Sequence, residues 1–266
     1  MQIISGSIYD YPRYYDLVFG SDWSAEYHFI RDAVRRHVDW GGEVPPLTAW
    51  RLLEPACGTG RLLYRFAKGG THAAGLDLNT AAVDYCNKRL RRSGLPESAW
   101  VADMCDFRVE RPYDAAFNTI NSFRHLASEQ AAAAHLEAMA EAMRPGAIYL
   151  LGLHLTPKRG PQTDEESWSA RRGNLVVNTH MWPRDKDRRN RVERYNIRFD
   201  VYQPSGHHRI EDCLELRSYT ADQFQSLVDC CPRWRIEESY DFRYSVEDPI
   251  EIDATTEDVV YVLNRV

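Results

Sequence analysis

The sequence predicts an α/β protein with a parallel sheet, helices on both of its faces and an antiparallel insertion. Three observations lead to this prediction. From Trp50 onward strand-like and helix-like segments alternate, which is typical of parallel strands joined by right-handed crossovers. Between about Thr156 and Arg217 strand-like segments follow one another with hairpin-like connectors. After Arg217 the alternation of helix and strand resumes.

Length and charge narrow the class of protein. The chain has 266 residues, of which 44% are hydrophobic and 27% charged, an ordinary globular composition that favours one domain with an insertion. A formal net charge of −6 argues against a general nucleic-acid binder. No apolar run approaches the roughly 20 residues that span a bilayer, and the N-terminus lacks signal-peptide features. We therefore expect a cytoplasmic protein, without nucleic acid or membrane as a partner, as a monomer or homodimer.

The cysteines predict neither disulfides nor a metal site. No pair has the C-x-x-C spacing, and the adjacent Cys230 and Cys231 suit neither role. We expect reduced thiols that pack as small hydrophobes and no structural metal. The six are Cys57, Cys86, Cys105, Cys213, Cys230 and Cys231.

Segment boundaries follow from capping and stop residues. Asn79 and Ser128 are the expected N-caps of two helices, and Gly69 and Gly94 are expected stops. The expected strands of the core are 51–56, 72–78, 99–104, 113–120, 147–155, 234–242 and 258–266. The expected helices are 61–70, 79–94, 128–146 and 220–231.

The insertion is expected to begin with a loop at 157–167. Three alternating segments then read as strands, and the polar connectors between them read as hairpin tips. The expected strands are 174–182, 191–202 and 207–219, and the connectors are 183–190 and 203–206.

A glycine motif after the first expected strand predicts a nucleotide-like ligand. In "LLEPACGTGRL", Gly58 and Gly60 let the backbone approach a ligand, and the next helix offers its N–H groups. Asp77 ends the second strand, 17 residues after Gly60, where an acid commonly accepts both ribose hydroxyls of an adenosine. These features fit a nicotinamide dinucleotide or another adenosine ligand.

Three departures from the dinucleotide pattern separate these ligands. Leu63 stands where the third glycine of that pattern would be. Glu54, expected in the loop before the glycines, would repel a pyrophosphate but could organise a cationic group. Asp103 follows the third strand, well placed to accept from an adenine amino group. Together they favour S-adenosylmethionine, which carries a sulfonium and an ammonium but no phosphate.

With these motifs the chain resembles the class I S-adenosylmethionine-dependent methyltransferases. The matching segments are "LEPACGTG", "GLDLN", "ADM" and "YDAAFNTINSF", within residues 50–155, and "ADQFQSLVDCC", "WRIEES" and "DVVYVLN" near the end. The resemblance implies a Rossmann-like, mostly parallel sheet of seven strands in the order 3-2-1-4-5-7-6, with the last strand antiparallel.

The resemblance also implies a domain organisation and a set of cofactor-binding residues. Residues 1–45 would form a lid segment and helix, 46–155 with 218–266 the methyltransferase core, and 156–217 an antiparallel insertion after strand 5 that caps the acceptor site. The residues implied around S-adenosylmethionine are Glu54, Ala56, Cys57, Gly58 and Gly60 at the methionine part, Asp77 at the ribose, Leu78, Asp103 and Met104 at the adenine, and Asn118 beneath the methionyl group, with its carbonyl on the ammonium.

A second resemblance concerns the methyl acceptor. "FNTINS" differs from the Asn/Asp-Pro-Pro-Tyr/Phe motif of enzymes that methylate flipped-out bases. The tyrosine-rich segment "IYDYPRYYDLVFG" resembles the lid of glycine/sarcosine and amino-sugar N-methyltransferases, and the insertion is placed like the roof of their acceptor pocket. This implies a small-molecule acceptor.

Methyl transfer to an amine needs alignment and desolvation more than a strong base, provided that the amine arrives neutral. Candidate catalytic residues are Tyr9 and Tyr15 in the lid and His125 after the fourth strand, a histidine able to take a proton. His154 points at the same rim, and Arg124 would either bind an acidic acceptor or face solvent.

Several alternatives stay open. N-methylation leads, with O-methylation of a small molecule behind it. A protein or RNA methyltransferase would need a basic groove or docking surface beside the strand ends. A non-catalytic S-adenosylmethionine-binding protein would keep the same glycines and acids. An oxidoreductase on the same fold is disfavoured by Leu63 at the third glycine position.

Overall fold

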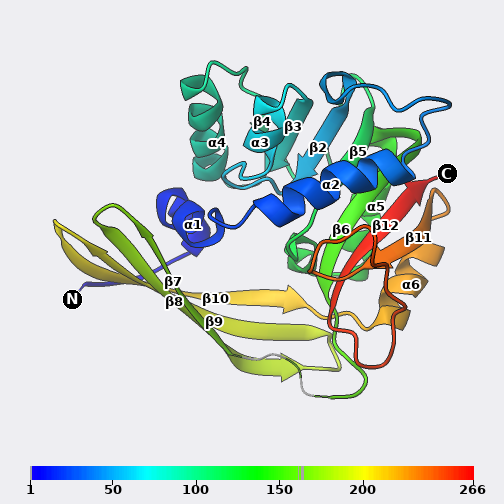
Figure 1. The fold of residues 1–266 in the computed structure, drawn as a ribbon. Helices are drawn as coiled ribbons and strands as arrows, with labels where there is room; N and C mark the ends of the chain where they lie inside the picture. Colours follow the sequence, from blue (N-terminus) through cyan, green and yellow to red (C-terminus); the bar gives the residue numbers. More distant parts are fainter. Residues whose placement is uncertain (1, 161, 163–164) are drawn as a thin grey trace.

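The computed structural model describes residues 2–160, 162 and 165–266. Its larger sheet has seven strands in the order β11-β12-β6-β5-β2-β3-β4, with β12 antiparallel to both of its neighbours. This confirms the expected order and the antiparallel last strand (Figure 1). The strands are β2 (Arg51–Pro55), β3 (His72–Asp77), β4 (Ala99–Val101), β5 (Tyr113–Asn118), β6 (Met143–His154), β11 (Trp234–Tyr240) and β12 (Asp258–Arg265).

Helices cover both faces of this sheet, as expected for an α/β protein. Leu52 packs into the hydrophobic cluster under α2, α3 and α4, whereas its neighbour Leu53 packs into the cluster under α5 and α6, because successive strand residues point to opposite faces. The helices are α2 (Ser24–His37), α3 (Leu63–Lys68), α4 (Thr80–Arg92), α5 (Glu129–Ala142) and α6 (Ala221–Asp229), and a short 3-10 helix, η2 (Leu47–Ala49), precedes β2.

The expected N-caps are confirmed. The Asn79 side chain accepts from the Ala82 N–H at 2.9 Å, and the Ser128 hydroxyl accepts from the Ala131 N–H at 3.0 Å.

Several boundaries are wrong. The end of the expected helix 128–146 belongs to β6, which begins at Met143, and the first part of the expected connector 183–190 belongs to β8 (Leu175–Asp187). Glu54 lies inside β2 rather than in the loop before the glycines.

A second sheet is formed by the insertion and the N-terminus. Its order is β1-β10-β9-β8-β7, from β1 (Gln2–Ser5), β7 (Glu166–Arg172), β8 (Leu175–Asp187), β9 (Val192–Gln203) and β10 (Gly206–Arg217). Three of these strands were predicted. The last two positions of the expected loop 157–167 belong instead to β7, and positions 161, 163 and 164 of that loop lie outside the described residues. β1 was not predicted, and it pairs parallel with β10.

The N-terminal segment lies between the two sheets. It contains η1 (Ile8–Asp10) and α1 (Pro12–Phe19), and in Figure 1 α1 lies between the inserted sheet and α4. Ile8, Leu17 and Val18 are buried in a third hydrophobic cluster with side chains of β8, β9 and β10. We call residues 7–19 the lid segment. Its apolar face is therefore part of a core that it shares with the insertion.

A buried carboxylate fastens the lid segment. Asp16 is 2% exposed, forms ion pairs with Arg89 of α4 and Arg172 of β7, and accepts from the Tyr85 hydroxyl at 3.1 Å and the Thr59 hydroxyl at 3.3 Å. Burial alone would raise the pKa of Asp16, but the charges and hydrogen bonds of the two arginines outweigh it and lower the pKa. One side chain thus joins α1, α4, β7 and the glycine loop.

The cysteine expectation is wrong in part. All six cysteines lie in the described part of the chain and are free thiols. Cys57, Cys86 and Cys231 are buried, but Cys213 and Cys230 are exposed and do not pack as small hydrophobes. Each helix in the described ranges is too short or too polar to cross a membrane.

The substitution Asp16→Asn should destabilise the protein strongly. It leaves two arginines beside a buried site without their anionic partner, and breaking a buried ion pair by removing one partner costs about 3 kcal/mol or more. Urea denaturation should show this loss in the free energy of unfolding. The control is Asp22→Asn, at an exposed neighbouring position, which should stay within about 0.5 kcal/mol of the parent. Equal stabilities of the two variants would contradict the role of Asp16.

Candidate functional site

A cavity of about 790 Å³ lies where the two sheets and the lid segment meet. One part of its wall comes from the carboxyl ends of β2, β3 and β5 and the loops that follow them. The other part comes from the lid segment and the inward face of the inserted sheet. Ligands of open α/β sheets bind outside the carboxyl ends of the strands, so this cavity is the candidate site.

The two glycines of the first motif serve different purposes. Ala56, Gly58 and Gly60 all have positive φ, at 52°, 52° and 68°. A Cβ on Gly58, which lines the cavity, would meet nothing within 4 Å, whereas one on Gly60 would stand 2.2 Å from the Sγ of Cys86. Gly58 therefore leaves room for a ligand, and Gly60 allows α4 to pack closely against the loop.

Asp77 holds the glycine loop and the start of α4 together. Its two carboxylate oxygens accept from the N–H groups of Gly58 and Asn79, each at 2.8 Å. Burial raises the pKa of Asp77, and these two hydrogen bonds oppose the shift in part. Leu78 follows on the cavity wall with 68% of its surface exposed, an unusual exposure that offers an apolar face to a flat ring.

In the third motif, "ADM", the two neighbours of Asp103 line the cavity and Asp103 itself does not. Ala102 and Met104 line the cavity, whereas Asp103 is exposed outside the wall and its Oδ1 accepts from the Cys105 N–H at 2.8 Å. From the core, the imidazole Nδ1 of fully buried His135 lies 2.9 Å from the carbonyl oxygen of Met104. Burial lowers the pKa of His135 to about 4, so that the ring is neutral and its Nδ1–H donates to this carbonyl.

Two further predicted residues, Asn118 and Glu54, are not part of the cavity wall. Asn118 is 5% exposed, and its Nδ2 donates to the carbonyl of Pro55 at 2.8 Å, while its Oδ1 is buried without a hydrogen-bond partner among the described residues. Glu54 accepts from the Leu63 N–H at 2.9 Å, and burial raises the pKa of the Glu54 carboxyl well above its usual range. An orphaned acceptor beside the glycine loop suits a ligand that brings hydrogen-bond donors.

These features fit S-adenosylmethionine in its chemistry. The open space at Gly58, the exposed Leu78 and the orphaned oxygen of Asn118 match a close backbone approach, an adenine ring and an ammonium group. Of the residues predicted to bind this cofactor, five line the cavity and five lie outside its wall. The former are Ala56, Gly58, Asp77, Leu78 and Met104, and the latter are Glu54, Cys57, Gly60, Asp103 and Asn118.

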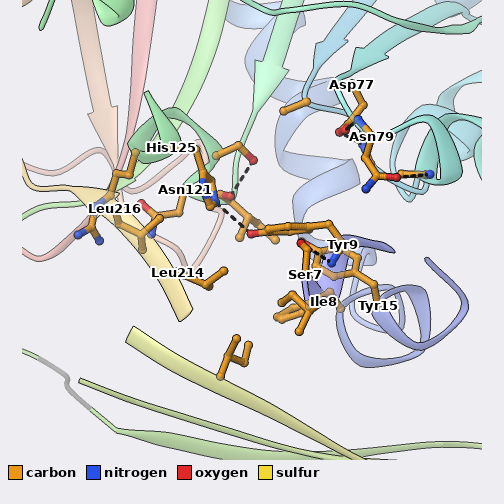
Figure 2. A pocket seen from close by; sticks show the side chains of 18 of the residues that line it. Ser7, Ile8, Tyr9, Tyr15, Asp77, Asn79, Asn121, His125, Leu214 and Leu216 are labelled. Carbon is orange, nitrogen blue, oxygen red and sulfur yellow. Dashed lines mark hydrogen bonds between the residues drawn. The ribbon is translucent and has the colours of Figure 1, made fainter. Parts of the chain in front are cut away.

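The three candidate catalytic residues all line the cavity and meet there (Figure 2). The hydroxyl of Tyr9 lies 3.0 Å from Nε2 of His125, and the rings of Tyr9 and Tyr15 are 5.3 Å apart between centroids. Burial raises the pKa of Tyr9 well above its usual value and that of Tyr15 to about 12. Both hydroxyls are therefore protonated near neutral pH.

The environment keeps His125 neutral. Enclosure by protein around the cavity lowers the pKa of its imidazole, and the charge of Arg124 lowers it further. With the ring proton of His125 on Nδ1, the protonated hydroxyl of Tyr9 donates to Nε2. The pair thus consists of a phenol donor and a neutral imidazole acceptor.

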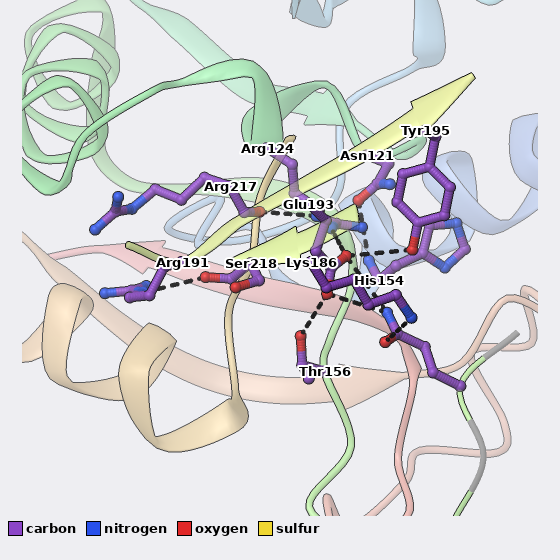
Figure 3. Close-up of polar contacts among 11 residues, drawn as sticks. Asn121, Arg124, His154, Thr156, Lys186, Arg191, Glu193, Tyr195, Arg217 and Ser218 are labelled. Carbon is purple, nitrogen blue, oxygen red and sulfur yellow. Dashed lines mark hydrogen bonds and ion pairs between the residues drawn. The ribbon is translucent and has the colours of Figure 1, made fainter. Parts of the chain in front are cut away.

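Arg124 behaves in neither of the two predicted ways. It is only 3% exposed, forms an ion pair with Glu193 of β9 at 2.5 Å and donates to the carbonyl of Arg217 at 2.8 Å (Figure 3). Its charge is therefore satisfied by the inserted sheet instead of by an acidic acceptor or solvent. This pair anchors η3 (Ser122–His125), the 3-10 helix that carries His125, to the insertion.

His154 lies on the cavity wall at the end of β6, as expected. Its Nδ1 is hydrogen-bonded to the carboxylate of Asp258 of β12, and its backbone N–H donates to Oδ1 of Asn121 at 3.0 Å. Sequence reasoning missed Asp258, as well as the apolar wall that the lid segment and insertion supply. The main members of that wall are Phe19, Trp168, Met181, Ile197, Leu214 and Leu216.

The substitution Asp77→Ala should weaken S-adenosylhomocysteine binding at least about 100-fold. It removes the proposed acceptor of two ribose hydroxyls, and hydrogen bonds to a charged group contribute about 1.5–3 kcal/mol each. It also frees the Gly58 N–H. Calorimetric titration measures the change, with Asp84→Ala, at an exposed position on α4, as the control. Unchanged affinity in a folded Asp77→Ala variant would rule out this role.

Known proteins resemble this chain in sequence. Residues 52–146 match the family model described as a methyltransferase domain. The chain is 30% identical over 162 residues to dTDP-3-amino-3,4,6-trideoxy-alpha-D-glucopyranose N,N-dimethyltransferase of Streptomyces venezuelae, covering 60% of this chain and 62% of that relative. It is 23% identical over 240 residues to dTDP-4-amino-2,3,4,6-tetradeoxy-D-glucose N,N-dimethyltransferase of Saccharopolyspora spinosa, covering 85% and 86% of the two chains. The first match thus spans less than two thirds of its relative's length.

Solved structures share the whole fold. Streptomyces venezuelae DesVI superposes with a TM-score of 0.75 at 22% identity over 96% of this chain and 97% of that chain. The sugar N-methyltransferase KedS8 of Streptoalloteichus gives a TM-score of 0.72 at 20% identity over 98% and 93%. The likeness therefore includes the lid segment and the inserted sheet. Residues 52–146 therefore match a methyltransferase domain, and the chain as a whole has the fold of these solved methyltransferases.

Proposed function

We propose that this chain methylates the amino group of a small molecule, with S-adenosylmethionine as the donor and an amino sugar as the leading candidate for the acceptor. The observation that carries the proposal is a single cavity that joins the glycine loop and Asp77 to the Tyr9–His125 pair. The sugar N,N-dimethyltransferases among its relatives support the acceptor class.

The donor would lie along the carboxyl ends of β2, β3 and β5. When bound, S-adenosylmethionine supplies a methyl group on a sulfonium that is already activated for in-line displacement. Asp77 would accept from the ribose hydroxyls, Leu78 and Met104 would flank the adenine, and the orphaned side-chain oxygen or the carbonyl of Asn118 would accept from the ammonium. Glu54, Ala56, Cys57, Gly58 and Gly60 would shape the methionine end, and Asp103 would accept from the adenine amino group.

The lid residues would align and desolvate the reacting groups. The rings of Tyr9 and Tyr15 offer π faces to a sulfonium and exclude water from it. The neutral imidazole of His125 can take the Tyr9 hydroxyl proton while that hydroxyl receives one from the acceptor ammonium. The amine nitrogen is then left with a lone pair for the transfer.

The remaining expectations follow from the same proposal. The acceptor would lie against the insertion 156–217, above a core of 46–155 and 218–266 and beneath the segment 1–45, in a monomer or homodimer without nucleic acid or membrane partners. We also propose a cytoplasmic location, supported by the six free thiols, because disulfides form mainly in oxidising compartments.

The acceptor class is tested with defined amines. The protein, S-adenosylmethionine with a radiolabelled methyl group and dTDP-3-amino-3,4,6-trideoxy-α-D-glucopyranose should give labelled mono- and dimethylated sugar. The 3-hydroxy analogue is the matched control and should stay unlabelled. Labelling of the hydroxy analogue would favour O-methylation. S-adenosylhomocysteine binding without methylation of any amine, phenol or carboxylic acid in a wider screen would favour a non-catalytic binding protein.

The substitution His125→Ala should lower kcat about 10- to 100-fold, because the proton acceptor behind Tyr9 is lost. S-adenosylhomocysteine affinity should change little, since the ring contacts Tyr9 rather than the glycine loop. Steady-state kinetics and calorimetry separate the two effects, with His72→Ala, an exposed position at the start of β3, as the control. Wild-type turnover in His125→Ala would remove His125 from the proposed mechanism.

A further inference from the structure

The cavity contains a second imidazole that is held by a carboxylate. His154 and Asp258 face each other in the register of β6 and β12, and both line the cavity. Oδ1 of Asp258 is bonded to Nδ1 of His154. A carboxylate accepts hydrogen bonds, so the neutral form of this imidazole has its proton on Nδ1 and its lone pair on Nε2. This is the arrangement of an oriented general base.

Two contacts hold His154 in place besides the one with Asp258. Its backbone N–H donates to the side chain of Asn121 at 3.0 Å, and Asn121 has a left-handed backbone with φ of 56°. The ring of Phe242 lies 5.1 Å away between centroids. The side chain is nevertheless 37% exposed, and it lines the cavity. An accessible nitrogen on a fixed ring is what proton transfer to a bound acceptor needs.

The same turn links the two histidines. Asn121 immediately precedes η3, which carries His125, and its side chain binds the backbone of His154. The two imidazoles differ in their free nitrogen. Nε2 of His125 accepts from Tyr9, so its lone pair is engaged, whereas Nδ1 of His154 is the engaged nitrogen and its Nε2 carries the available lone pair. His154 is therefore the more direct proton acceptor.

We propose that His154 is a second general base of this site and that Asp258 is its positioning residue. This inference rests on the proposed amine methylation. An N–H bond of the acceptor ammonium breaks, its electron pair stays on nitrogen, and the proton bonds to Nε2 of His154. The carboxylate of Asp258 stabilises the imidazolium that results. The freed lone pair of the acceptor then forms the bond to the methyl carbon, and the carbon–sulfur electron pair remains on sulfur.

The His154–Asp258 pair would be useful when the same nitrogen is methylated twice. After one transfer the acceptor is again an ammonium, because the new N–C bond uses the lone pair. A second transfer to the same nitrogen requires a second proton to leave. With Tyr9–His125 and His154–Asp258 on one cavity, two separate groups can accept protons during successive rounds.

Variants of the pair test the inference by kinetics with the amino sugar that the wild-type protein methylates. His154→Gln should lower kcat at least 10-fold, and Asp258→Asn should lower it by a smaller factor, while both keep wild-type affinity for S-adenosylhomocysteine. The control is His180→Gln. His180 is not part of the cavity wall, and its Nε2 lies 2.7 Å from a carboxylate oxygen of Glu165. This variant should keep wild-type turnover. Wild-type kcat in a His154→Gln variant that binds S-adenosylhomocysteine would overturn the inference.

Chemical rescue separates chemistry from structure. In His154→Ala, added imidazole should restore at least several-fold of the lost turnover, because the truncated site opens to the cavity. Added imidazole should leave His180→Gln unchanged. Failure of imidazole to raise the turnover of folded His154→Ala would overturn the role as a base.

A readout without turnover tests the orientation itself. Nitrogen-15 spectra of the ring-labelled protein should show His154 as the Nδ1-protonated tautomer, with the preference lost in Asp258→Asn. The Nε2-protonated tautomer in the wild-type protein would overturn the inference whatever the acceptor. If the wild-type protein methylates no amine, the proposed function fails. If the wild-type protein methylates an amine and His154→Gln has the same kcat, the proposed function stands and only the role of His154 as a base fails.

Discussion

The buried carboxylate of Asp16 is the constraint on which the cavity depends. It is bound at once by Arg89 of α4, Arg172 of β7 and Thr59 of the glycine loop, so the lid helix, the core and the insertion meet at one group. Removing the partners of a buried charge lowers the free energy of unfolding strongly. Asp16 belongs to the lid segment, which also carries Tyr9 and Tyr15. The positions of these two tyrosines in the cavity therefore depend on the contacts of Asp16 with α4 and the glycine loop.

The polar groups around the cavity are arranged to stay uncharged or paired. Burial keeps Tyr9 and Tyr15 protonated and His125 neutral, while Glu193 pairs with the adjacent Arg124. Transfer from a sulfonium gains most from alignment and exclusion of water, and a neutral, largely apolar wall serves both. In the proposed mechanism, the side chains of the cavity take part in the chemistry only as proton acceptors, at His125 and at His154.

Local patterns predicted the large sheet well and the cavity only in part. The caps at Asn79 and Ser128 and the strand–helix alternation are readable because they depend on neighbours in sequence. β7 has few apolar side chains, chiefly Trp168 and Ala170, and β1 has four residues, so both depend on pairing that the sequence does not display. The contact of Tyr9 with His125 joins positions 116 apart, and the ion pair of Arg124 needs a partner from β9. Such contacts appear only when both sheets are assembled.

Calorimetric titration of the wild-type protein with S-adenosylhomocysteine and, separately, with NAD tests the central claim most directly. The absence of a glycine at Leu63, the open backbone at Gly58 and the orphaned oxygen of Asn118 predict specific binding of S-adenosylhomocysteine and none of NAD. Tight binding of NAD without binding of S-adenosylhomocysteine would contradict the assignment of the donor and, with it, the proposed methyl transfer.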